Sequence, residues 1–182
     1  MTQRGFTLIE LLITLAIAAI LATVAVPAFS GFLARQQLAS DVNQMISVLS
    51  FARSEAIKQR REIAVIFSPP TSVIANRRPE SCRNNESSFE QNGEIFYTYS
   101  GWCYLVESDK EGDVLRVGEA ANVTAPENEF KVIFQSLGDA ELDECGSPCE
   151  ITISPQRAQS NVTPITLAIN ITGSIRRKES GL

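Results

Sequence analysis

The run Gly5-Phe6-Thr7-Leu8-Ile9-Glu10 opens an apolar segment, and residues 11–34 that follow it carry no charge. The pattern predicts a membrane-grade helix that holds one carboxylate, that of Glu10, near its start. A glutamate near the bilayer centre costs about 2.5 to 3.5 kcal/mol on insertion scales, and intramembrane ionisable groups usually have a dedicated partner. We therefore expect Glu10 to pair with an ammonium group.

Proteolysis between Gly5 and Phe6 would create such an ammonium group. The new α-amine of Phe6 would lie about one helical turn from Glu10, on the same chain or on a neighbouring copy. The segment resembles the N-terminus of type IV pilins and of the pseudopilins of type II secretion systems. The resemblance implies that a prepilin peptidase removes residues 1–5 and methylates Phe6, and that Glu10 guides docking into a growing filament.

Two other interpretations of this segment are weaker. A secretory signal peptide needs a small-residue cleavage site, for which Val26-Pro27-Ala28 is a poor match, and its apolar core would not contain Glu10. An ordinary single-span anchor fits the length, because residues 11–34 would rise about 36 Å against a hydrocarbon core of about 30 Å. The anchor leaves Glu10 and the short leader unexplained, so the pilin-like interpretation is favoured.

The charge distribution predicts the orientation of the chain. Arg4 lies on the short leader, which is cytoplasmic under the positive-inside rule, so the chain from Arg35 onward is expected outside, in the periplasm. The net charge is −5, with 21 acidic against 16 basic residues. This balance argues against a generic nucleic-acid binder, because that affinity comes from basic groups that neutralise phosphates.

The four cysteines form an even set in a domain expected to be exported, where disulfides persist. Three pairings are possible. We favour Cys82 with Cys103 and Cys145 with Cys149, because each pair closes a local loop. A zinc site is the alternative, but the chain has no histidine and lacks paired C-x-x-C motifs, so no metal or cofactor is expected.

The apolar periodicity continues past the first segment at steps of three and four, and it predicts an amphipathic helix to about Arg61. Its stripe comprises Leu38, Val42, Met45, Leu49, Ala52 and Ala56, broadened by Ile46 and Ile57. Polar residues such as Asp41 occupy the other positions. Pro27 removes one helical hydrogen bond, so we expect a kink near residues 24–27.

After the helix, short segments rich in β-branched and aromatic residues predict strands at residues 63–67, 94–99, 102–106, 114–117, 130–134, 151–153, 165–171 and 175–176. Ser100-Gly101 predicts a two-residue hairpin between the second and third of these. Residues 69–70, 77–92, 109–113 and 139–148 are predicted loops. One long helix followed by many strands predicts an α+β fold, with the helix packed on an antiparallel β-sheet domain.

The run Phe51-Ala52-Arg53-Ser54-Glu55-Ala56 leads into the first predicted strand. It resembles the element at which the helix enters the sheet in the GspH/FimT branch of type IV pilin-like proteins, which includes the minor pilins FimU and FimT and the minor pseudopilin GspH. A final strand with the pattern Gly-x-x-Arg, from Gly173, adds to the resemblance, which implies the type IV pilin fold. Arg53 and Glu55 themselves are interpreted as solvated helix charges, worth about 0 to 1 kcal/mol.

The C-terminus carries a basic cluster, Arg176, Arg177 and Lys178, placed after a strand and a turn. Such a cluster suits phosphate contacts. It resembles the Gly-Arg-x-Arg element of FimT-like competence pilins, which is associated with DNA capture, although Ser174 stands where the first arginine would be. The alternative is a solvated, fraying tail.

No catalytic signature occurs, so the chain is not expected to be an enzyme. We expect a leader at residues 1–5, a transmembrane and assembly half-helix at 6–34, an amphipathic half-helix at 35–61 and a periplasmic β-rich domain at 62–182. The predicted function is that of a minor pilin that starts or caps a type IV pilus. Its expected partners are other minor and major pilins, prepilin peptidase, the inner-membrane assembly platform and membrane lipid. The alternatives are a minor pseudopilin of type II secretion and a DNA-binding competence pilin.

Overall fold

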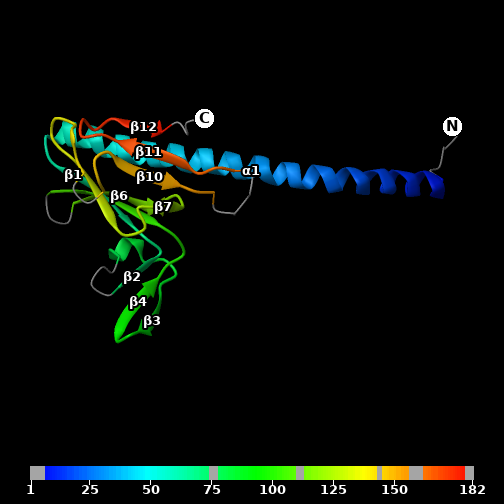
Figure 1. Cartoon of the computed structure of the whole chain (residues 1–182), viewed down its shortest axis with the longest axis horizontal. Coiled ribbons are helices and arrows are strands. Elements are labelled where there is room, and N and C mark those ends of the chain that lie inside the picture. Colours follow the sequence, from blue (N-terminus) through cyan, green and yellow to red (C-terminus); the bar gives the residue numbers. More distant parts are fainter. Residues whose placement is uncertain (1–6, 74–77, 110–112, 143–144, 156–161, 179–182) are drawn as a thin grey trace, which may run out of the picture.

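The computed structural model describes residues 7–73, 78–109, 113–142, 145–155 and 162–178, except for the side chains of residues 24–28. A single helix, α1 (Leu8–Gln59), dominates its long axis (Figure 1). The helix is 52 residues long, or about 78 Å at 1.5 Å per residue. It ends where Arg60 adopts the left-handed conformation, with φ at 53°, and donates its N–H to the carbonyl of Ala56.

The second half of α1 is amphipathic in the way the periodicity predicts. Its buried apolar side chains are Leu38, Val42, Met45, Val48, Leu49, Ala52 and Ala56. Two predictions at this surface are wrong. Ile57, which was expected to broaden the stripe, is 48% exposed, whereas Asp41, which was expected on the polar side, is 6% exposed. Both lie at the boundary of the stripe, where the contour of the sheets decides burial.

Two antiparallel sheets form the body of the domain. The first has the order β6 (Val114–Glu119), β5 (Cys103–Ser108), β1 (Ile63–Ser68), β8 (Phe130–Phe134) and β9 (Ala140–Glu141). The second has the order β12 (Ile175–Lys178), β11 (Ile165–Ile169), β10 (Cys149–Ile153) and β7 (Val123–Ala125). Alternate side chains of the central strands are fully buried and share one core with the apolar stripe of α1. These are Ile63, Val65, Phe67, Phe130, Val132, Phe134, Ile151, Ile153, Leu167 and Ile169.

A third sheet stands off this body (Figure 1). Its order is β2 (Thr71–Val73), β4 (Glu94–Thr98) and β3 (Ser87–Gln91), and we call it the arm. A short 3₁₀ helix, η2 (Glu80–Cys82), precedes β3. The arm corrects one prediction, since β4 pairs with β2 and β3 and not with β5. Ser100-Gly101 is therefore a crossing between sheets and not a hairpin turn.

The predicted fold class is confirmed, since a long N-terminal helix packs on antiparallel sheets. Within the described part of the chain, no helix reaches the combined length and apolarity of a membrane span. Helix α1 runs without interruption through Pro27, whose side chain lies outside the described residues. The kink there stays a prediction.

Candidate functional site

The start of α1 is closed by a capping box. Thr7 is the N-cap, and its hydroxyl accepts from the backbone N–H of Glu10 at 3.3 Å, while Glu10 Oε2 accepts from the backbone N–H of Thr7 at 3.3 Å. Helices prefer this arrangement because it satisfies two N–H groups that have no partner inside the helix. The predicted cleavage and methylation sites, Gly5 and Phe6, lie outside the described residues, so the pairing of Glu10 with an α-amine stays a prediction.

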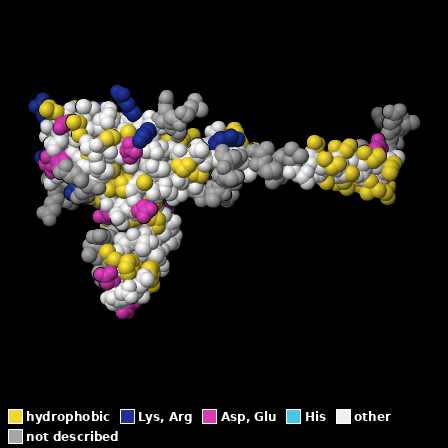
Figure 2. Space-filling model, viewed as in Figure 1, with side chains coloured by type: hydrophobic (Ala, Val, Ile, Leu, Met, Phe, Trp, Pro, Cys, Tyr) yellow, Lys and Arg dark blue, Asp and Glu magenta, His cyan; other side chains and the backbone are white. Residues whose placement is uncertain are grey.

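Beyond the capping box, the described apolar side chains in the first half of α1 are exposed (Figure 2). Their exposed fractions run from 50% to 77%. They are Leu8, Ile9, Leu11, Leu12, Ile13, Leu15, Ile17, Ile20, Leu21, Phe29, Phe32 and Leu33. A soluble monomer rarely exposes so long an apolar surface, and such a surface indicates burial against lipid or other subunits.

Arg53 joins α1 to both main sheets. Its Nε donates to the carbonyl of Gly138, in the β8–β9 turn, at 2.8 Å, and its Nη2 donates to the carbonyl of Thr172, in the β11–β12 turn, at 3.0 Å. The two turns also meet directly, because a Cβ on Gly173 would lie 2.0 Å from the Gly138 oxygen. We call this contact the Arg53 clasp.

The Arg53 clasp gives a physical reason for two elements of the sequence, the run that contains Arg53 and the glycine that precedes the last strand. Sequence reasoning treated Arg53 as a solvated charge, but its side chain is half-buried and satisfies two turn carbonyls. The positive φ of Gly173, 70°, and its approach to Gly138 explain why a glycine precedes the last strand. Glu55 is bonded locally, to Lys58 Nζ and Gln59 Nε2.

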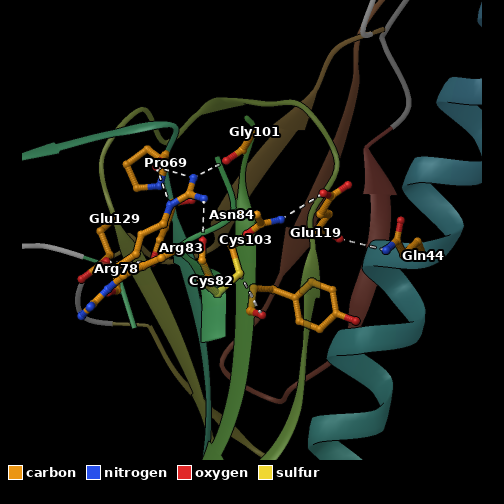
Figure 3. The surroundings of a disulfide bond; sticks show 12 residues. Gln44, Pro69, Arg78, Cys82, Arg83, Asn84, Gly101, Cys103, Glu119 and Glu129 are labelled. Atoms are coloured by element: carbon orange, nitrogen blue, oxygen red, sulfur yellow. Dashed lines mark hydrogen bonds between the residues drawn. A yellow bond between two sulfur atoms is a disulfide. The ribbon is translucent and has the colours of Figure 1, made fainter. Parts of the chain in front are cut away.

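The base of the arm is fixed by a disulfide between Cys82 and Cys103, whose Cα atoms are 5.9 Å apart (Figure 3). It links η2 to the first residue of β5. Next to it, Asn84 donates to the Glu119 carboxylate at 3.1 Å, and Gln44 on α1 donates to the Glu119 carbonyl at 3.0 Å. The Cys82–Cys103 pairing is one of the two disulfides that the sequence favoured.

Arg78 is the second anchor of the arm, and sequence reasoning missed it. It is 2% exposed. Its guanidinium donates to the carbonyls of Ser68, Pro69, Cys82 and Gly101. It also lies 4.2 Å from the centre of the Tyr99 ring. Burial lowers the pKa of the Arg78 guanidinium, although the nearby Tyr99 and Glu129 act in the opposite direction.

The other disulfide joins Cys145 to Cys149, with the Cα atoms 5.0 Å apart, and it closes the turn before β10. It too is the pairing that the sequence favoured. Within the described residues, no group of three or more Cys, Asp or Glu side chains is arranged to hold a metal ion.

The C-terminal cations lie on β12, a strand at the edge of the second sheet. Arg177 donates to Asn43 Oδ1 on α1 at 2.9 Å, and Lys178 pairs with Glu150 at 2.8 Å. Two of the three cations are therefore engaged within the chain. The DNA-binding hypothesis stays a prediction, and it rests mainly on Arg176.

Comparisons with known proteins agree with this architecture. Residues 1–26 match the prokaryotic N-terminal methylation motif. The chain is 42% identical over 67 residues to a fimbrial protein of Pseudomonas aeruginosa, covering 37% of this chain and 43% of that protein. It is 54% identical over 74 residues to the type IV major fimbrial protein FimA of Dichelobacter nodosus, covering 41% and 45%. It thus spans less than half the length of these relatives. No solved structure matches it.

The long helix, the methylation motif and the antiparallel sheets together define a type IV pilin-like protein. Residues 41–173 match the family described as type II transport protein GspH, and the chain belongs to that family. The predicted membership of the GspH/FimT branch is confirmed. The matched region includes both ends of the Arg53 clasp and the whole arm.

Proposed function

We propose that this protein is a minor pilin that helps to initiate or cap a type IV pilus, together with other minor pilins. The observation that carries the proposal is the division of α1. One half exposes an apolar surface that begins at Leu8 and surrounds Glu10, and the other half packs its apolar face in a β-rich domain. A subunit built in this way assembles through its helix and presents its domain outside.

In this proposal, prepilin peptidase acts after Gly5, and the subunit waits in the inner membrane with its domain in the periplasm. Glu10 then contacts the α-amine of a neighbouring subunit. The described hydrogen bonds to the carboxylate engage Oε2. Docking through the other oxygen would therefore leave the capping box in place, and the helix start need not unwind when subunits join.

The test replaces Glu10 by alanine in the full chain in its native cells. Membrane insertion should be unchanged or improved, because an intramembrane charge is costly. Incorporation into surface fibres should fall by at least about tenfold, since each 1.4 kcal/mol of lost pairing is a factor of ten. Immunoblots of sheared fibres and of membranes measure the two quantities. Thr14→Ala, one turn further along the same exposed helix, is the control, and normal incorporation of Glu10→Ala would contradict the assigned role.

A minor pseudopilin of a type II secretion system is the second candidate, because the matched family is described as a type II transport protein. The same helix would then assemble into a short periplasmic fibre. Deletion of the gene separates the two candidates. Loss of surface pili with normal secretion supports the pilus, whereas retained exoproteins with normal pili support secretion.

A further inference from the structure

The arm has a free edge. Strand β3 lies at the border of its sheet, and all five of its residues are exposed. Over the described residues, no strand pairs with the outer side of β3. An open edge of this kind is a template for a strand from another chain, because the backbone N–H and C=O groups on its outer side have no neighbouring strand to bond.

An apolar row crosses one face of the arm next to that edge. Val73, Phe96 and Phe89 are in register across β2, β4 and β3. The Phe89 and Phe96 rings stack at 5.4 Å, and Phe89 remains 45% exposed. An exposed aromatic pair on a protruding sheet gains stability when a partner covers it.

The charges of the arm indicate which charged side chains a partner strand should carry. Glu90 and Glu94 lie on β3 and β4, and residues 87–98 contain no lysine or arginine. Figure 2 shows acidic side chains at the far end of the arm. A partner strand that approaches β3 is therefore favoured by basic side chains and disfavoured by acidic ones, because opposite charges across a strand pair are stabilising and like charges are destabilising.

The chain itself carries a strand with this chemistry. β12 is an edge strand of the second sheet and contains Arg176, Arg177 and Lys178, all exposed. Among the described contacts, Arg176 has no hydrogen-bond or ion-pair partner, and within the described residues no strand pairs with the outer side of β12, although the strand contacts α1 through Arg177. Figure 1 places β12 and the arm on opposite sides of α1.

We propose that the arm of one copy docks on the β12 edge of a second copy, with β3 and β12 as adjacent strands. The two surfaces are different and lie on opposite sides, so the contact is heterologous and leaves one free surface on each copy. This inference goes beyond the proposed function, which does not require two copies to be neighbours.

Because the base of the arm is already fixed, little conformational entropy is lost when this contact forms. The Cys82–Cys103 disulfide and the four carbonyls held by Arg78 fix the arm on the body before any partner arrives. Association then loses little conformational freedom, because a preorganised surface needs little ordering on binding.

The experiment places the photoreactive residue benzoylphenylalanine at Phe89 in the full chain in native cells and maps the cross-linked peptides by mass spectrometry. The expected adduct joins Phe89 of one copy to residues 175–178 of another. Glu90→Lys with Glu94→Lys should reduce this adduct by about tenfold, and adding Arg176→Glu with Arg177→Glu should restore it, because opposite charges face each other again. Asp113→Lys with Glu127→Lys, two exposed acids outside the arm, is the matched control.

An adduct to a different protein, an adduct within one copy, or an adduct that ignores the charge exchange would overturn the inference. Fibre incorporation is read separately in the same cells. If the wild type and the Glu90→Lys, Glu94→Lys chain enter fibres equally and no copy-to-copy adduct forms, the inference fails and the proposed function stands. If the adduct forms but the wild type never enters fibres, the proposed function fails and the inference stands.

Discussion

At the scale of single residues, the clasp around Arg53 shows how one side chain can hold distant parts of a fold together. Its acceptors, Gly138 and Thr172, are 85 and 119 residues away in the sequence. A solvated helix arginine would contribute about 0 to 1 kcal/mol. The bond from the charged Arg53 donor to the Gly138 carbonyl is partly buried and contributes more, about 1.5 to 3 kcal/mol, whereas the exposed bond to the Thr172 carbonyl contributes less.

Alanine substitutions at three glycines distinguish destabilisation by backbone strain from destabilisation by steric contact. Gly173→Ala should destabilise the protein by about 3 kcal/mol, because it adds a strained φ of 70° and a Cβ that would meet the Gly138 oxygen. Gly93→Ala, with φ at 81° and open space, should cost about 1 kcal/mol. Gly101→Ala has neither problem and should stay within about 0.5 kcal/mol. Urea unfolding of the detergent-solubilised chains measures all three, and equal losses would contradict the clasp.

Asp41 predicts a dependence of stability on pH. Burial raises the pKa of its carboxyl, although the Gln37 hydrogen bond opposes this, and Oδ2 has no hydrogen-bond partner among the described residues. Because the folded pKa lies above the unfolded value, the carboxyl favours folding when protonated. That contribution is lost as the pH rises from the unfolded pKa, about 3.9, through the folded pKa.

Asp41→Asn should therefore be more stable than the wild type at pH 7, by about 1 kcal/mol. The difference should shrink as the pH falls and should disappear below the unfolded pKa of about 3.9, where the Asp41 carboxyl is neutral in both states. Thermal midpoints between pH 3.5 and pH 7.5 provide the measurement. Asp113→Asn, at an exposed aspartate, is the control, and a difference between Asp41→Asn and the wild type that does not change with pH would show that Asp41 is ionised in the folded protein at little cost.

At the scale of helices and strands, most of the body could be predicted, because burial and sequence pattern coincide there. The alternation in β1 and β8 marks faces that pack on α1, and Leu38 to Ala56 recur at helical spacing for the same reason. β3 could not be found by pattern, because Ser87–Gln91 is exposed on both faces and has no period.

The sequence nevertheless contains a local signal for the β3–β4 hairpin. Asn92 and Gly93 separate β3 from β4, and both have positive φ, at 55° and 81°. Asn-Gly is the preferred pair for a two-residue hairpin because both positions need that conformation. Which sheet a strand joins is a different matter, since β4 and β5 are neighbours in sequence yet belong to different sheets. Nor could the role of Arg78 be predicted, because its acceptors come together only in the fold.

The anchoring of the arm can be tested through Arg78. Arg78→Met should destabilise the chain by about 3 kcal/mol, because the buried carbonyls of Pro69 and Gly101 lose a donor. Arg61→Met is the matched control, since Arg61 is 47% exposed and makes one ion pair at 3.7 Å, and it should cost less than about 1 kcal/mol. Urea unfolding compares the two, and similar losses would show that Arg78 does not anchor the arm.

At the scale of the whole molecule, the long helix separates two environments. Its first half offers apolar side chains and Glu10, while its second half is the spine of the domain. Residue pattern alone predicted this division, because apolar length and helical periodicity are local properties. The placement of the arm and of β12 on opposite sides of α1 depends on the topology of three sheets, which no local pattern encodes.

The leader prediction is tested on intact protein. Mass spectrometry of the chain from native cells should show a polypeptide that begins at Phe6 and carries one additional methyl group, as the methylation motif over residues 1–26 indicates. Protein from cells without prepilin peptidase is the control and should keep Met1. A mature chain that retains residues 1–5 in wild-type cells would contradict the processing.

The bond between Cys82 and Cys103 also sets the order of events in the life of a subunit. Thiols stay reduced in the cytosol and are oxidised after export. If the domain is exported as proposed, a newly made chain has only Arg78 to anchor its arm, and the Cys82–Cys103 bond forms when the domain reaches an oxidising compartment. Under the proposed docking of the arm on β12, the docking surface would then become rigid only after export, which disfavours association of chains that are still in the cytosol.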